Sequence, residues 1–112
     1  MRVIIVMDDN LIGIDGYYID DLDLSSIDVS IHAVQWYETY GEVEYKTSLI
    51  DGSLHKVQNS IIKSLTDFQS VIDVFYVEKE KRLVAKAAAD AAAEIANQEY
   101  LEKEAAKLEV PV

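Results

Sequence analysis

The C-terminal part of this chain reads as one uninterrupted helix, from residue 66 to residue 110. At about 1.5 Å per residue, such a helix would be roughly 60 Å long. A compact domain of about 100 residues has a radius of gyration of only about 13 Å. A chain of 112 residues therefore cannot wrap the whole helix in its own core. We expect most of the helix to need a second copy of the chain, or another protein, to cover its apolar stripe.

Apolar residues recur along the distal helix at the spacing of a coiled coil. They follow one another at intervals of four, three and four residues, break once near residues 97–98, and then resume. Eight of the twelve residues from 85 to 96 are alanine, which favours helix and lets helices approach closely but buries little area. The predicted assembly interface consists of Val84, Ala88, Ala91, Ile95, Leu101, Ala105 and Leu108.

The residues before the helix indicate a small antiparallel sheet. Short β-branched or alternating segments at 2–7, 11–14, 17–19, 31–37 and 42–46 are separated by turn residues, and 60–62 is a candidate edge strand. Asp15-Gly16 favours a type I′ hairpin turn. The predicted fold class is α+β, with four or five strands packed by the start of one long C-terminal helix.

The start of the helix carries a capping signal and an apolar face. Thr66 followed by Gln69 predicts a capping box. Behind it, Phe68, Val71, Ile72 and Phe75 have helical spacing and should lie across the sheet. The residues expected to meet this face are Trp36, Val34, Val43, Tyr45, Ile4 and Val6.

The composition of the predicted helix changes after residue 77. Residues 78–82 contain no apolar side chain, so we expect a head of residues 1–82 and a helical tail of residues 83–112. Intrahelical pairs Glu78–Arg82 and Glu99–Lys103 should add a few tenths of a kcal/mol each.

Charge narrows the classes of partner. Residues 1–77 carry 13 Asp and Glu against four Lys and Arg, a net charge of −9, whereas residues 78–112 carry eight against six, a net charge of −2. Such a head repels phosphate, which disfavours nucleic-acid binding and favours a protein partner or simple solubility. No apolar run approaches the roughly 20 residues of a membrane span, and the N-terminus does not resemble a signal peptide. Cysteine is absent, and we expect an intracellular protein.

Tyrosines gather beside acids in the predicted sheet. If Trp36 faces the core, its neighbour on the strand points the other way. Exposed tyrosines beside carboxylates form a plausible contact surface for a protein, although ordinary half-buried sheet tyrosines would give the same pattern. The possible partner patch consists of Tyr17, Tyr37, Tyr40, Glu42 and Glu44.

No pattern for catalysis or for a cofactor is found. Residues 8–13 resemble the start of a calcium loop, but Ile12 and Ile19 occupy positions where ligands belong, so a hairpin turn is favoured. Asp20, Asp21 and Asp23 are read as a solvated loop rather than a metal site. The two histidines, His32 and His55, belong to no nucleophile motif, and no glycine-rich phosphate loop is present. We expect no enzyme activity, no metal and no cofactor.

Three segments carry a resemblance to a known group. These are residues 2–10, then Ile31-His32-Ala33-Val34-Gln35-Trp36-Tyr37 with Gly41-Glu42-Val43-Glu44-Tyr45, and then residues 64–69. Together they resemble small acidic proteins encoded near the tail-fibre genes of tailed bacteriophages. The likeness covers roughly residues 1–82, and it implies no catalytic or ligand residue.

The resemblance implies a structural or interaction protein of the tail-fibre apparatus, in the host cytoplasm during assembly or in the virion tail. In that hypothesis the helix forms a homo-oligomer or a complex with a virion protein. The alternative is a tail-fibre assembly chaperone that is absent from the mature particle. A third hypothesis, an inhibitor that mimics nucleic acid with the acids of residues 8–44, fits the charge but leaves the long helix unexplained.

Overall fold

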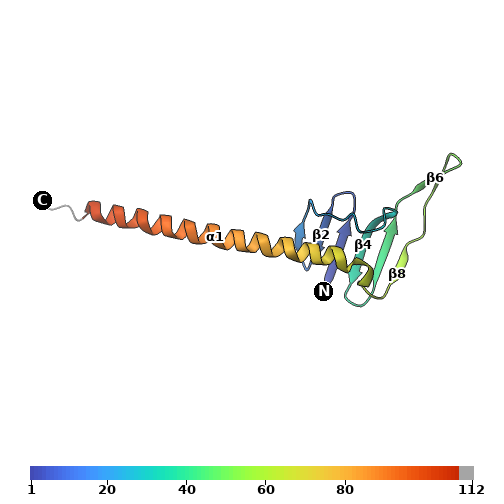
Figure 1. Cartoon of the computed structure of the whole chain (residues 1–112), viewed down its shortest axis with the longest axis horizontal. Helices are drawn as coiled ribbons and strands as arrows, with labels where there is room; N and C mark the ends of the chain where they lie inside the picture. The colour runs from blue at the N-terminus through green and yellow to red at the C-terminus, as the bar shows by residue number, and fades with distance from the viewer. Residues whose placement is uncertain (109–112) are drawn as a thin grey trace. The chain divides into compact units, whose positions relative to one another are not determined.

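The computed structural model describes residues 1–108. Within that range the chain forms a six-stranded sheet, a two-stranded sheet, one 3₁₀ turn and one long helix (Figure 1). The strands of the larger sheet are β1 Arg2–Val6, β2 Leu11–Ile14, β3 Tyr17–Ile19, β4 Ile31–Tyr37, β5 Gly41–Tyr45 and β8 Ser60–Ile62. The remaining elements are β6 Ser48–Ile50, β7 Ser53–His55, η1 Thr66–Phe68 and α1 Gln69–Leu108. The predicted α+β class is confirmed.

The larger sheet is antiparallel throughout, in the order β3-β2-β1-β4-β5-β8. It has six strands rather than four or five because both short segments, β3 and β8, pair at its edges. The turn between β2 and β3 has positive φ at Asp15 (49°) and Gly16 (86°), as the predicted type I′ turn requires.

The first turns of α1 and one face of the sheet enclose the core. Val71, Ile72 and Phe75 from α1 pack with inward residues of the strands and with apolar residues of the loop between β3 and β4. Of the residues expected to meet the helix, Val34, Trp36 and Val43 are buried in this cluster and Tyr45 packs against it. The other loop and sheet members are Val3, Ile5, Ile12, Ile14, Ile19, Leu22, Leu24, Ile27 and Ile31.

The expectation for β1 is wrong by one residue. Val3 and Ile5 are fully buried, whereas Ile4 and Val6 lie half-buried on the other face. Every residue of β1 except Arg2 is apolar, so the strand shows no alternation that would mark its inner side. Its pairing decides the matter, because Val3 stands opposite Trp36 on the neighbouring strand, and directly paired residues point to the same face.

The predicted capping box is also not formed. Residues 66–68 make a 3₁₀ turn that is preceded by Leu65, and no side chain caps it. The backbone N–H of Phe68 donates to the carbonyl oxygen of Leu65 at 2.9 Å. Gln69 instead donates from Nε2 to Asp73 Oδ1 at 2.8 Å, one turn further along α1. A backbone bond of the tight first turn thus takes the place of the side-chain cap.

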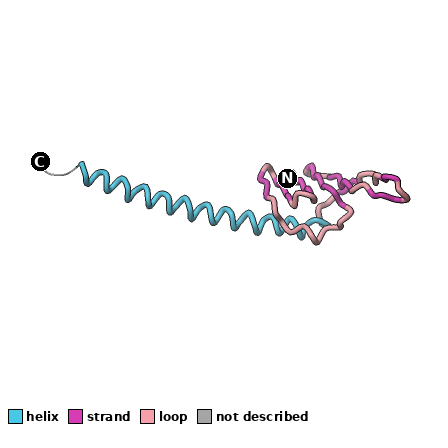
Figure 2. Tube along the Cα trace, turned by 90° about the horizontal axis from the view of Figure 1, so that it is seen from above, coloured by secondary structure: helices cyan, strands magenta, loops and turns pink. Residues whose placement is uncertain are grey.

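The two-stranded sheet is a hairpin that extends beyond the larger sheet (Figures 1 and 2). Leu49 stands opposite Leu54 across its two strands, and both side chains are exposed, at 70% and 76%. Asp51 and Gly52, both at positive φ, form its turn. An isolated hairpin of this size has little stability of its own in water.

Because the hairpin buries no side chain, we expect it to contribute little to the stability of the fold. Replacing Leu49 and Leu54 together by serine should change the free energy of unfolding by less than about 0.5 kcal/mol. The matched substitution Leu24→Ser, at a buried leucine of the core, should lower it by more than about 2 kcal/mol. Urea denaturation followed by tryptophan fluorescence makes the comparison. Equal losses for the two variants would show that the hairpin is part of the cooperative core.

The chain divides into two compact units, Met1–Val77 and a second that begins at Glu78. The predicted boundary after residue 82 lies five residues further along, at the end of the charged stretch of residues 78–82. Among residues 1–108, no helical stretch combines the length and the hydropathy that a membrane span requires.

Candidate interaction surfaces

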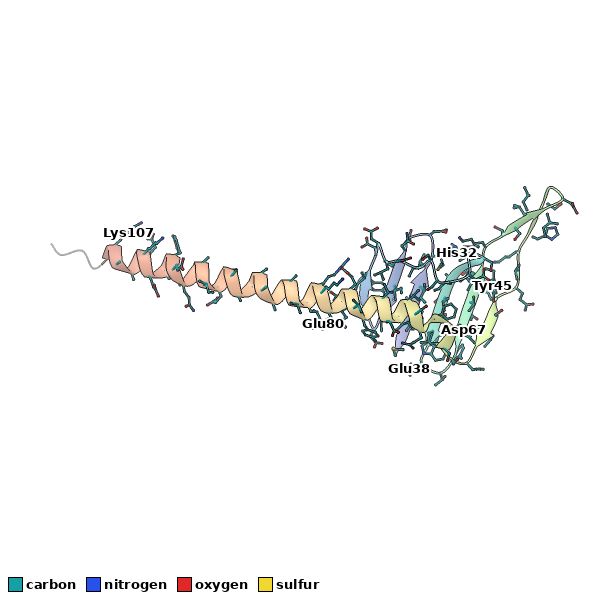
Figure 3. The ribbon with its side chains drawn as sticks, in the orientation of Figure 1. His32, Glu38, Tyr45, Asp67, Glu80 and Lys107 are labelled. Atoms are coloured by element: carbon teal, nitrogen blue, oxygen red, sulfur yellow. The ribbon has the colours of Figure 1, made fainter. Side chains whose placement is uncertain are left out.

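The distal part of α1 exposes nearly all of its side chains. From residue 80 to residue 107, only Glu104 is half-buried. Figure 3 shows the side chains of this stretch between the labelled Glu80 and Lys107. Val84 and Ile95 are exposed to 59% and 60%, and Leu83, Tyr100 and Leu101 are exposed as well. Isolated apolar side chains on a surface are common. Apolar residues from Val84 to Ile95, in contrast, recur at regular helical spacing and form a continuous stripe. This stripe is available to a partner.

The predicted interface residues fall into two groups around the helix. Each residue of an α-helix advances by about 100° around the axis, so Val84, Ala88, Ala91 and Ile95 share one face. Leu101 and Ala105 lie about a quarter of a turn away from that face. The backbone of Leu108 ends α1, but its side chain lies outside the described residues. One straight partner helix can cover the first group, and we call this first group (Val84, Ala88, Ala91 and Ile95) the seam.

Two ion pairs between residues four positions apart form along the same stretch of helix. Arg82 Nε lies 3.1 Å from Glu78 Oε1, which confirms the first predicted pair, and Lys86 Nζ lies 2.6 Å from Asp90 Oδ2. The second predicted pair is wrong, because within residues 1–108 no ion pair joins Glu99 to Lys103. With these pairs and its many alanines, the segment has strong intrinsic helix propensity.

Four of the five residues of the predicted partner patch lie on the face of the sheet opposite the core or at its rim. Tyr37, Glu42 and Glu44 alternate with the buried residues of β4 and β5, and Tyr40 stacks on Tyr37 with ring centroids 5.2 Å apart. Tyr17 is not with them. Its ring packs against the core side, edge-on to Phe75 at 6.2 Å between centroids.

Arg2 contacts Gln35 and Tyr37 on the face of the sheet opposite the core. The sequence alone did not identify Arg2 as part of this surface. Its guanidinium donates to the carbonyl oxygens of Val3 and Trp36 and to Gln35 Oε1, at 2.8–3.0 Å. The same group lies over the ring of Tyr37, 4.3 Å from its centroid. The available signal was that Arg2 is the only Lys or Arg before Lys46. We call Arg2, Gln35, Tyr37, Tyr40, Glu42 and Glu44 the outer sheet face.

Lys63 Nζ lies over the ring of Tyr40, 5.6 Å from the ring centroid. Each of the two stacked tyrosine rings therefore has one cation over it. Cations over aromatic faces hold the rings in place and leave less of them free for a partner. The two tyrosines of the outer sheet face thus have partners within the chain.

Several acids of residues 8–44 contact other residues of the fold while remaining exposed. Asp8 lies within 4 Å of His32 and Lys46. Hydrogen bonds from the side chain and backbone of Ser25 lower the pKa of Asp23.

The pKa of Asp28 is lowered in the same way, by a backbone hydrogen bond from Ser30 and then by the Ser30 side chain. The predicted position of His32 in a strand is confirmed, and His55 ends β7 as an exposed residue. Within residues 1–108, no three His, Asp or Glu side chains gather as a metal site would require.

Comparison with known proteins adds no relative to this picture. No family model matches the chain, and neither a curated protein nor a solved structure matches it. The function is therefore inferred from the surfaces of the molecule itself.

Proposed function

We propose that this protein is a structural interaction protein that assembles through the distal part of α1. The observation that carries the proposal is the exposure of Val84 and Ile95, at 59% and 60%, at the two ends of a regular helical stripe. Covering such a stripe removes apolar area from water at about 25 cal/mol per Å². The alanines between these two residues let a second helix come close along the whole length of the seam.

A second copy of the chain is the partner that fits best. The segment from residue 78 onward carries eight acids and six bases, so two copies do not repel strongly there. Residues 1–77 carry a net charge of −9, which disfavours assembly of two such units through their acidic surfaces. Association through the helix therefore joins the least repulsive parts of two chains.

The tail-fibre apparatus of a tailed bacteriophage is the setting that the sequence resemblance supports. In that setting an oligomeric chain fits a component of the particle. A chain that stays monomeric would present its seam to a different protein, as a tail-fibre assembly chaperone would do. The mimic hypothesis is less well supported, because it assigns no role to the exposed apolar side chains of the distal helix.

The seam predicts the oligomeric state. Light scattering coupled to size exclusion should give the full chain a mass of at least twice its 12.6 kDa. Val84→Glu with Ile95→Glu should reduce it to a monomer, because both charges would enter the covered stripe.

Leu83→Glu with Tyr100→Glu is the matched control. These two residues are also exposed but lie off the seam, so the same added charge should leave the mass unchanged. A monomeric full chain at all accessible concentrations would overturn self-assembly. Equal effects of the two double variants would show that net charge, and not the seam, controls association.

A further inference from the structure

The order of residues along the seam is the same in both directions. Val84, Ala88, Ala91 and Ile95 are separated by four, three and four residues, with the two large side chains outside and the two alanines inside. The midpoint lies between Ala89 and Asp90. Two such helices running in opposite directions about this midpoint place Val84 opposite Ile95 of the second copy. They also place Ala88 opposite Ala91, so every seam residue has an apolar counterpart.

Charge differs sharply between the two halves of this segment. Residues 78–86 carry four bases and two acids, a net charge of +2, whereas residues 90–104 carry five acids and one base, a net charge of −4. In a parallel pair of helices, each half would lie beside the identical half of the second copy, so charges of the same sign would face each other. The antiparallel arrangement sets the acidic half against the half that contains Lys79, Lys81, Arg82 and Lys86.

The seam positions next to the apolar four favour the same direction. Continuing the heptad spacing outward by three residues reaches Lys81 on one side and Gln98 on the other. A parallel pair would place two Lys81 ammonium groups face to face near the covered stripe, which costs free energy. The antiparallel pair places Lys81 opposite Gln98, whose amide oxygen accepts a hydrogen bond.

From these three features we propose that two copies of the chain pair antiparallel through α1, centred between Ala89 and Asp90. This rests on the proposed self-assembly and adds its direction and register. The small residues at the centre let the helix axes approach, while the larger Val84 and Ile95 close the two ends of the contact.

Cysteine cross-linking tests the direction, because the chain contains no cysteine. Two α-carbons must lie within about 7 Å for a disulfide. In the antiparallel pair, Val84 of one copy is 11 positions along the helix from Val84 of the other, roughly 16 Å. Neither Val84→Cys alone nor Ile95→Cys alone should cross-link, whereas their equimolar mixture in a glutathione buffer should give a disulfide dimer. We expect at least about tenfold more cross-link in the mixture than in either variant alone.

Ala93→Cys, which lies on the opposite side of the helix from the seam, is the off-seam control and should not cross-link. Light scattering on each reduced variant is measured in parallel. Efficient cross-linking of Val84→Cys with itself, in a dimeric sample, would overturn the antiparallel direction and leave self-assembly standing. A dimer that forms no disulfide in the mixture would overturn the register. Monomeric reduced variants together with a monomeric parent chain would instead overturn the proposed self-assembly itself.

Discussion

Replacing Phe75 by alanine should lower the free energy of unfolding by about 3–5 kcal/mol. Phe75 is fully buried in the first turns of α1, and it is the largest side chain that the core encloses completely. Its removal leaves a cavity and takes away the edge-on contact with Tyr17, whose ring plane is inclined at 83°. Since small domains are stable by only about 5–15 kcal/mol, the variant should be close to unfolding.

Urea denaturation followed by the fluorescence of Trp36, a core residue, measures this loss. Val77→Ala is the control, because Val77 lies two residues further along the same helix and is exposed. It should change the free energy of unfolding by no more than about 0.5 kcal/mol. Similar losses for the two variants would contradict the prediction, because they would show that burial of Phe75 against the sheet is not what distinguishes the two positions.

Gly41→Ala should also be costly, by about 1–3 kcal/mol. A Cβ atom at Gly41 would stand 2.6 Å from the backbone oxygen of Gln35 and 3.0 Å from the ring of Trp36. Gly41 begins β5, which is paired on both sides, by β4 and β8. A backbone oxygen within a paired strand cannot move aside without shifting the sheet, so the substitution must displace β5.

Gly13→Ala is the matched comparison. A Cβ atom at Gly13 would stand 2.3 Å from the ring of Tyr18, which is closer still. That ring belongs to an exposed side chain, which can rotate away into water. We therefore expect Gly13→Ala to cost less than Gly41→Ala in the same denaturation assay. The reverse order would show that the ring of Tyr18 is as firmly held as the backbone.

Local signals in the sequence were sufficient for the strands of the larger sheet and for the long helix, but not for β6 and β7. Asp15-Gly16 marks a turn because few residue pairs tolerate positive φ at two successive positions. The alternation of Val43 with Glu42 and Glu44 marks both the strand and its inner side. The helix follows from its composition, because alanine and charged residues at i,i+4 spacing favour it without any tertiary contact.

Signals were missing where local and tertiary preferences compete. The capping box at Thr66 is compatible with the sequence, yet a backbone bond from Phe68 to Leu65 closes the first turn instead. The position of Tyr17 against the core depends on its contact with Phe75 of α1, a long-range contact that spacing along the chain cannot reveal. The candidate seam was predictable because it lies on a single helix, where neighbours are determined by spacing alone.

The sequence by itself did not indicate β6 and β7. It did determine the strands of the larger sheet, the turn between β2 and β3, the long helix and the face of that helix that carries the candidate seam. Each of these depends on residues within a few positions of one another. Only the tertiary structure decided which side of β1 faces inward, because an all-apolar strand fits either way until β4 pairs with it. The tertiary structure likewise placed Arg2 over Tyr37, because the register of β1 and β4 sets these two residues opposite each other.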